Sequence, residues 1–193
     1  METIELSILK QLGEKGRGRI FFAQEFYGTW PESSVRFSLS NLARGVFCYP
    51  RLTEHGMKML LPDTDEIARA IAEKTRVRIV PFGDQAAYLV GLTGVQFSST
   101  TYLTDGAPRK IRLSNGRTIE FLHTSEMRIF AFRSRKMQLI SNAVRAIGKE
   151  NVKATEREVL KWYLDGIPAG EFEADIQLCP EWVREILLDL KVN

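Results

Sequence analysis

PESSVRFSLSNLARGVFCYP, residues 31–50, is the stretch that decides how the first part of this 193-residue chain folds. Pro31 suits the first turn of a helix, where its missing N–H costs nothing. One apolar stripe then recurs at helical spacing: Val35, Leu39 and Leu42. Gly45 is typical of the position just past a helix, and Pro50 stops the apolar run that follows it. The stretch therefore predicts a helix over about 31–44 and a strand over 46–49.

The residues before this stretch predict the rest of a small helix-turn-helix. A first helix is indicated by an apolar stripe at helical spacing: Ile4, Ile8, Leu9 and Leu12. The run Ile20-Phe21-Phe22 predicts a strand, and a short helix follows it and ends near Gly28. A helix-turn-helix with a strand beside it commonly places its last helix in a DNA groove, so DNA binding is the first hypothesis.

Polar side chains would line the outer face of the helix predicted over 31–44. Arginine and asparagine suit bidentate contacts to base edges, whereas serine suits phosphates. The basic loop before the first strand would contact phosphates without sequence choice. The candidate DNA-binding residues are Arg17, Arg19, Ser33, Ser34, Arg36, Ser40, Asn41 and Arg44. The alternative is that this module serves only as a platform for protein contacts.

The rest of the chain predicts an α+β fold in a second domain. Residues 51–62 resemble a connector, so we expect domains over 1–52 and 63–193. Asp63 and Glu66 form a capping box that begins the next helix. A strand over 77–81 and a short helix over 85–90 follow, with Asp84 as the cap of that helix.

An antiparallel meander and three helices complete the predicted second domain. The three strands are expected over 100–104, 110–113 and 118–122, with turns at Asp105-Gly106 and Asn115-Gly116. The first helix covers about 134–147. The second begins at a capping box of Thr155 and Glu158, and the third has Pro180 in its first turn.

Positive charge is concentrated in the middle of the chain. Residues 69–136 carry 12 Lys/Arg against 5 Asp/Glu, whereas residues 137–193 carry 7 against 10. Part of this surplus of positive charge forms a basic strip on the predicted hairpin, which consists of Lys110, Arg112 and Arg117. Lys110 and Arg112 share one strand face, because side chains alternate along a strand. The strip would bind DNA or another acidic partner, and the alternative is an ordinary exposed strand face.

No residue pattern in the sequence indicates catalysis or a metal site. His55 and His123 stand alone, and Cys48 and Cys179 match no metal-ligand spacing, so we expect two reduced thiols. The scattered acids Asp84, Asp105 and Glu120 each have a structural role available. No apolar run is long enough to span a bilayer, and the first residues are not a secretory signal. We therefore expect a cytoplasmic protein that is not an enzyme and needs no cofactor.

Several blocks are similar, in order, to an AbiEi-like family of antitoxins and transcriptional regulators from bacterial abortive-infection (type IV) toxin–antitoxin systems. They include GRIFFAQEF, ARGVFCYP, DEIARAIAEK, GDQAAYLVGLTGVQ and DIQLCPEWVREILL. The resemblance implies an N-terminal winged helix-turn-helix that represses its own operon. It also implies a C-terminal domain that counters a nucleotidyltransferase-like toxin. One departure is that Asn41-Leu42-Ala43 runs almost directly into Gly45-Val46, so a first wing strand is expected to be missing. A second is Phe37 on the outward face of the helix, which we expect to cover part of the core.

Two main hypotheses follow from the sequence; a third is a degenerate nucleic-acid enzyme whose metal-dependent activity would need Asp84 or Asp105, and we expect no such activity. In the first, the protein is a DNA-binding antitoxin and autorepressor in phage defence, which binds promoter inverted repeats as a homodimer. In the second, it does not bind DNA and acts as an antitoxin or adaptor through its C-terminal α+β domain. Trp162 and Trp182 would then anchor a protein partner, because aromatic residues concentrate interface energy. Three acidic residues would rim that surface: Glu171, Glu173 and Asp175.

Overall fold

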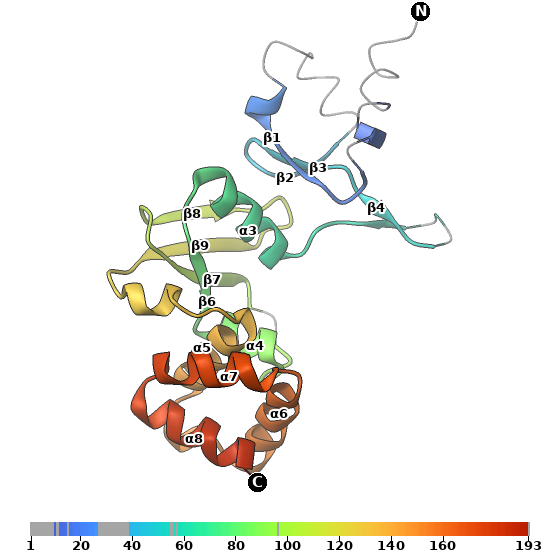
Figure 1. Ribbon diagram of the computed structural model, residues 1–193. Helices are drawn as coiled ribbons and strands as arrows, with labels where there is room; N and C mark the ends of the chain where they lie inside the picture. The colour runs from blue at the N-terminus through green and yellow to red at the C-terminus, as the bar shows by residue number, and fades with distance from the viewer. Residues whose placement is uncertain are drawn as a thin grey trace, which may run out of the picture. The chain divides into compact units, whose positions relative to one another are not determined.

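The chain divides into two compact units, each with its own sheet (Figure 1). The computed structural model describes residues 10, 12–14, 16–26, 39–54, 56, 58–95 and 97–192. The N-terminal unit comprises Met1–Thr75 with Ile111–Thr118, and the C-terminal unit comprises Arg76–Lys110 with Ile119–Asn193. Helices and strands are both present in the described residues, which confirms the α+β class. This division differs in two ways from the boundary expected at 51–62. The N-terminal unit continues to Thr75, and it also includes Ile111–Thr118, a hairpin tip from later in the chain.

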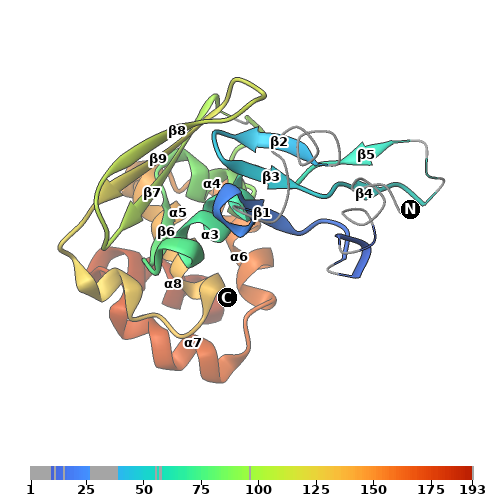
Figure 2. The ribbon, with the colours of Figure 1, turned by 90° about the horizontal axis from the view of Figure 1, so that it is seen from above.

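A three-stranded antiparallel sheet organises the N-terminal unit. Its strands are β1 (Ile20–Phe22), β2 (Ser40–Ala43) and β3 (Val46–Cys48), in the order β1-β3-β2. Strands β2 and β3 form a tight hairpin (Figure 2), in which Gly45 adopts a left-handed conformation with φ of 72°. Glycine takes this conformation without steric cost, so it closes the hairpin turn.

The hairpin overturns two sequence predictions. The helix expected over 31–44 does not extend to its predicted end, because Ser40–Ala43 is strand β2. The first hairpin strand that we expected to be missing is therefore present. Leu39 lies just before β2 and Leu42 lies within it, and both are buried. Their burial alone does not distinguish a helix from a strand, and the pairing of β2 with β3 makes this segment a strand. Residues 31–38, which include Phe37, lie outside the described residues.

One face of this sheet packs into a small aromatic core. Its buried members are Leu12, Phe21, Phe26, Leu39 and Phe47. The rings of Phe21 and Phe26 lie 5.7 Å apart between centroids. The short 3-10 helix η1 (Ala23–Glu25) follows β1, and Glu25 accepts a hydrogen bond from the Phe22 backbone N–H at 2.8 Å. Each buried phenylalanine contributes about 2 to 3 kcal/mol by removing its ring from water.

The stretch expected as a connector forms a two-stranded ribbon instead. Its strands are β4 (Arg51–Leu52) and β5 (Met59–Leu60), which pair antiparallel. The Thr53 backbone N–H donates to the Lys58 carbonyl oxygen at 2.9 Å and closes the ribbon end. The prediction failed because polar and glycine residues at 53–58 indicate a loop, whereas the paired strands contain only two residues each.

Helix α3 (Thr64–Thr75) confirms the predicted capping box. The Glu66 backbone N–H donates to Asp63 Oδ1 at 2.7 Å, and the Asp63 N–H donates to Glu66 Oε2 at 2.9 Å. These two bonds satisfy backbone groups that a helix N-terminus otherwise leaves unpaired. Ile67 and Ile71 are buried, as the apolar stripe of this helix predicts.

The sheet of the C-terminal unit contains the predicted strands in an unexpected order. The strands are β6 (Ile79–Phe82), β7 (Ser99–Thr104), β8 (Arg109–Arg112) and β9 (Thr118–His123), in the order β6-β7-β9-β8. Strand β7 therefore neighbours β9, so the three strands do not form the simple meander that was expected. Asp105 does not turn the chain into a β7–β8 hairpin. It accepts two hydrogen bonds from Arg78 instead, at 2.8 Å and 2.7 Å.

Helices complete the C-terminal unit around its largest core. They are α4 (Asp84–Val90), η2 (Met127–Phe130), α5 (Arg135–Ile147), η3 (Lys149–Asn151), α6 (Ala154–Asp165), α7 (Ala169–Asp175), η4 (Ile176–Leu178) and α8 (Glu181–Val192). The buried residues of this core come from α4, α5, α6, α7 and α8, among others. Lys153 is the N-cap of α6, and its N–H donates to Glu156 Oε2 at 3.2 Å, so the capping box lies two residues before the predicted one.

The N-terminus of α5 is capped by a carboxylate from elsewhere in the chain. Asp175 is buried and accepts hydrogen bonds from the Arg133 N–H at 3.0 Å and the Ser134 N–H at 2.7 Å. This overturns the prediction that Asp175 rims an exposed acidic surface. Trp162 is 76% exposed, whereas Trp182 packs partly buried against the core. None of the helices in the described part of the chain is both long and apolar enough to cross a membrane.

Candidate nucleic-acid interface

The tip of the β8–β9 hairpin docks on the outer edge of β2, within the N-terminal unit. The Ser114 backbone N–H donates to the Leu42 carbonyl oxygen at 2.8 Å, and Ser114 Oγ donates to the Asn41 carbonyl oxygen at 2.8 Å. Ala43 and Leu113 form an antiparallel bridge between the two segments. The hydrogen-bonding groups that β2 presents on this edge are thereby partly paired, which protects an edge that would otherwise be open.

Two arginines flank this bridge. Arg44 follows Ala43 in the chain and Arg112 precedes Leu113, so both lie at the same end of the bridge. Both residues are exposed, and neither makes a hydrogen bond or ion pair with any described residue. A polyanion that lies across this end of the bridge would neutralise both charges.

The two loop arginines predicted to contact phosphates differ in how far their charges are neutralised. Arg17 donates from Nη1 to the Pro50 carbonyl oxygen at 3.1 Å, and its guanidinium lies 4.6 Å from the centre of the Tyr49 ring. Both partners are uncharged, so its positive charge is retained. Arg19 forms an ion pair with Glu25 at 3.5 Å. Of the two, Arg17 is therefore the better phosphate contact.

The other candidates from the predicted helix are placed as follows. Ser40 is half-buried in β2 opposite Cys48, and Asn41 is exposed opposite Phe47. Arg44 lies in the hairpin turn between β2 and β3. The prediction that a helix carries these three residues is therefore wrong, because residues 40–44 form a strand and its turn. Three candidates lie outside the described residues: Ser33, Ser34 and Arg36.

The prediction that Lys110 and Arg112 share one exposed strand face is confirmed. Lys110 and Arg112 alternate with half-buried residues along β8 and are both exposed. Arg117 is half-buried beyond the Asn115-Gly116 turn, where its backbone N–H donates to Asn115 Oδ1 at 3.1 Å. Arg112 and Arg117 belong to the N-terminal unit, and Lys110 belongs to the C-terminal unit.

Several titratable groups of the C-terminal unit have partners within that unit. The Arg78 side chain holds the pKa of Asp105 below its ordinary value, chiefly by hydrogen bonding. His123 Nδ1 lies 3.0 Å from the Gly106 carbonyl oxygen. No group of three or more potential metal ligands occurs among the described residues. Cys48 and Cys179 are free and buried, and burial raises the pKa of Cys48 to about 11.

Sequence reasoning missed that Arg44 and Arg112 flank one bridge. The two arginines belong to segments that are far apart in the chain, and no local pattern in either segment signals the bridge between Ala43 and Leu113. Both arginines were already candidates from the sequence. The structure adds the bridge that joins their segments.

The comparisons with known proteins identify a family but no function. No curated protein and no solved structure is significantly similar to this chain. One family model matches residues 7–166, which covers most of the chain and both units. The chain therefore belongs to a family of unknown function, DUF6088.

Proposed function

We propose that this protein is a DNA-binding transcriptional regulator that contacts duplex DNA with the β2–β3 hairpin and the adjoining hairpin tip. The observation that carries the proposal is the Ala43–Leu113 bridge, which two exposed arginines flank, Arg44 and Arg112. Arg17 adds a third exposed cation whose partners are uncharged. Two-stranded ribbons enter DNA grooves in several protein classes, and arginine is favoured in narrow minor grooves.

The sheet of the N-terminal unit also supports a winged helix-turn-helix. The AbiEi-like resemblance implies a wing of two strands, and β2 and β3 form a hairpin at the corresponding place in the chain. Within this proposal the protein represses its own operon and is the antitoxin of a nucleotidyltransferase-like toxin in abortive infection.

A homodimer fits this function, because helix-turn-helix proteins usually bind paired half-sites. The β4–β5 ribbon and the residue after it carry four large, exposed apolar side chains: Leu52 (40%), Met59 (65%), Leu60 (45%) and Leu61 (52%). Large exposed apolar side chains gathered on one short segment mark interaction sites. We assign this ribbon to contact with a second copy of the chain.

The direct test is binding of purified protein to a fluorescent duplex taken from upstream of its own gene, followed by anisotropy. Affinity should fall steeply as salt rises, because bound arginines release condensed counterions. A scrambled duplex of the same length measures the non-specific component. No binding to either duplex at low salt would refute the proposal.

The second candidate function is an antitoxin or adaptor that does not bind DNA and acts through the C-terminal unit. The observation that favours it is Trp162 on α6, which is 76% exposed. Large exposed aromatic residues are common anchors of protein interfaces. Co-expression with a nucleotidyltransferase-like toxin encoded beside the gene separates the two candidates. Rescue that survives loss of Arg44 and Arg112 but not Trp162→Ala supports the second.

A further inference from the structure

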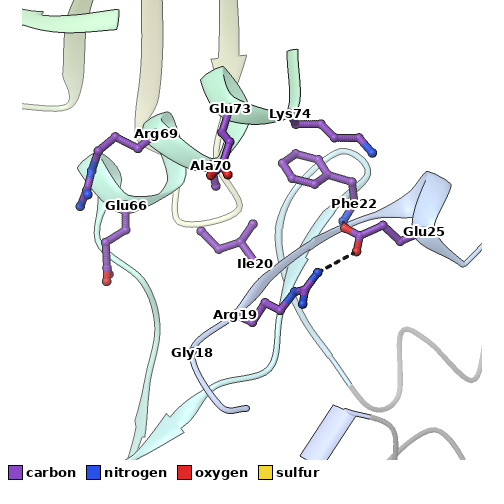
Figure 3. A pocket seen from close by; sticks show the side chains of 10 residues that line it. All are labelled: Gly18, Arg19, Ile20, Phe22, Glu25, Glu66, Arg69, Ala70, Glu73 and Lys74. Atoms are coloured by element: carbon purple, nitrogen blue, oxygen red, sulfur yellow. Dashed lines mark hydrogen bonds and ion pairs between the residues drawn. The ribbon is translucent and has the colours of Figure 1, made fainter. Parts of the chain in front are cut away.

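A groove of about 620 Å³ separates β1 from α3 in the N-terminal unit (Figure 3). Ile20 and Phe22 project into it from β1, and Ala70 and Glu73 face them from α3. Its full lining comprises Gly18, Arg19, Ile20, Phe22, Glu25, Glu66, Arg69, Ala70, Glu73 and Lys74. The groove thus has an apolar floor and a charged rim.

The groove runs along the outer edge of β1. Ile20 and Phe22 of β1 line the groove, whereas their partners on β3, Cys48 and Val46, do not. The groove therefore lies on the side of β1 that faces away from β3. Strand β3 occupies the inner edge of β1, and β1 is at the end of the sheet in the described residues. The outer edge is therefore the one that borders the groove.

The hydrogen-bond pattern leaves backbone groups of Ile20 directed outward. The Tyr49 N–H donates to the Arg19 carbonyl oxygen at 3.2 Å, and the Ala23 N–H donates to the Gly45 carbonyl oxygen at 2.9 Å. Because bonded and non-bonded pairs alternate along an antiparallel ladder, Phe21 bonds to β3 and Ile20 does not. Ile20 thus presents one N–H and one carbonyl oxygen to the groove, and Phe22 presents its carbonyl oxygen.

Two charged groups of the rim have no ion pair with any described residue, Glu73 and Lys74. Arg19 pairs with Glu25, Glu66 pairs with Arg51, and Arg69 pairs with Asp65. The Lys74 ammonium lies 5.7 Å from the centre of the Phe22 ring. Glu73 has neither an ion pair nor a hydrogen bond in the part of the chain that the structure describes. The Glu73 carboxylate therefore favours a cation beside it on whatever occupies the groove.

We propose that this groove binds an extended peptide segment of a partner protein, which adds antiparallel to β1 as a fourth strand. Its backbone would exchange hydrogen bonds with Ile20, as in recognition by strand addition elsewhere. Apolar side chains would face Ile20, Phe22 and Ala70, and a Lys or Arg between them would pair with Glu73. The inference is independent of DNA binding by the Arg44 surface.

The probe is the capped peptide acetyl-TVTKTVT-amide, which places valine, lysine and valine on one face of a strand. Titration into the ¹⁵N-labelled full chain should shift the Ile20 amide resonance and those of α3. The matched peptide with Glu in place of Lys should bind more weakly by about two- to fivefold, the range of one exposed ion pair. Glu73→Lys should reverse this preference, which a general loss of folding could not do.

Backbone pairing is tested separately from charge. Methylating the amide nitrogens of the lysine and the two valines should abolish binding, because in antiparallel addition these alternate residues direct their N–H groups at β1 and one of them pairs with Ile20. Methylating the central threonine nitrogens, which point away, should leave binding intact. Ile20→Pro removes the protein donor without breaking a β1–β3 bond, and Ile20→Val is its control. Equal binding of all the peptides, or no shift in β1 and α3 at millimolar peptide, would overturn the proposal.

Discussion

Ser114 donates its backbone N–H to the Leu42 carbonyl oxygen at 2.8 Å and joins the β8–β9 hairpin tip to strand β2. The Ser114 hydroxyl donates to the neighbouring Asn41 carbonyl across a separation of 73 residues. Through this contact, arginines from two remote segments share one surface of the N-terminal unit. The proposed DNA interface depends on it, because neither segment alone carries more than a few cations.

Loss of the Ser114 contact should weaken DNA binding without removing a charge. Ser114→Ala deletes the hydroxyl bond to Asn41 and keeps the backbone bond to Leu42, whereas Ser114→Pro also removes the N–H. We expect a small effect from the first and a larger one from the second, since the hairpin tip loses its anchor to β2. Anisotropy with the upstream duplex measures both. Equal affinity of Ser114→Pro and wild type would show that the docking of the tip is irrelevant to binding.

Asp175 should be a principal determinant of stability in the C-terminal unit. It is 1% exposed and caps the α5 N-terminus through the Arg133 and Ser134 N–H groups. Asp175→Ala leaves both donors unpaired and should lower the free energy of unfolding by about 1 to 3 kcal/mol. Urea denaturation followed by circular dichroism measures the change. Glu173→Ala, an exposed neighbour, is the control and should stay within about 0.5 kcal/mol of wild type.

Buried Cys48 should make the N-terminal unit less stable in alkali. Burial raises its pKa from 9.0 to about 11. The unfolded thiol ionises near its ordinary value while the folded thiol stays protonated, so the folded state holds more protons between these two pKa values. The free energy of unfolding should therefore fall as pH rises from 9 to 11.

The contribution of Cys48 is isolated by comparison with Cys48→Ala, both in a Cys179→Ala background. Other groups titrate between pH 9 and 11 in both proteins. The difference between the two slopes of unfolding free energy against pH therefore gives the contribution of the Cys48 thiol. Urea denaturation at several pH values supplies the slopes. Parallel slopes would show that the pKa of Cys48 is not raised by folding.

The β4–β5 ribbon should control the oligomeric state. Met59→Ser and Leu60→Ser replace exposed apolar side chains, so the isolated monomer should keep its stability while self-association weakens. Sedimentation equilibrium across a range of concentrations measures the association. Leu188→Ser, at an apolar side chain 42% exposed in the C-terminal unit, is the matched control. A wild-type protein that stays monomeric at high concentration would contradict the homodimer.

The sequence predicted those parts of the structure whose signals are local. The capping box of Asp63 and Glu66 involves residues three positions apart, and α3 begins there as expected. The turn at Asn115-Gly116 was predicted for the same reason. The α+β class and most strand positions in the C-terminal unit also followed from local periodicity.

Other features depend on pairing between distant segments and could not be predicted. Leu39, Leu42 and Gly45 fit a helix with its terminal glycine or a strand with its turn glycine, and only the partner strand β3 distinguishes them. Asp175 looked like one more surface acid, because the α5 N-terminus it caps is about forty residues away. At the candidate site, the sequence supplied the arginines, and the tertiary bridge supplied their arrangement.

The most direct test of the central claim is a salt titration of DNA affinity for wild type, Arg44→Ala, Arg112→Ala and the double variant. Each single variant should weaken binding and reduce the slope of log affinity against log salt by about 1, because one phosphate contact is lost. The two effects should not be additive, since the arginines flank one bridge and would contact the same stretch of DNA. Lys149→Ala, an exposed cation in the C-terminal unit, is the control. Unchanged affinity and slope in the double variant would contradict the assignment of this surface to DNA.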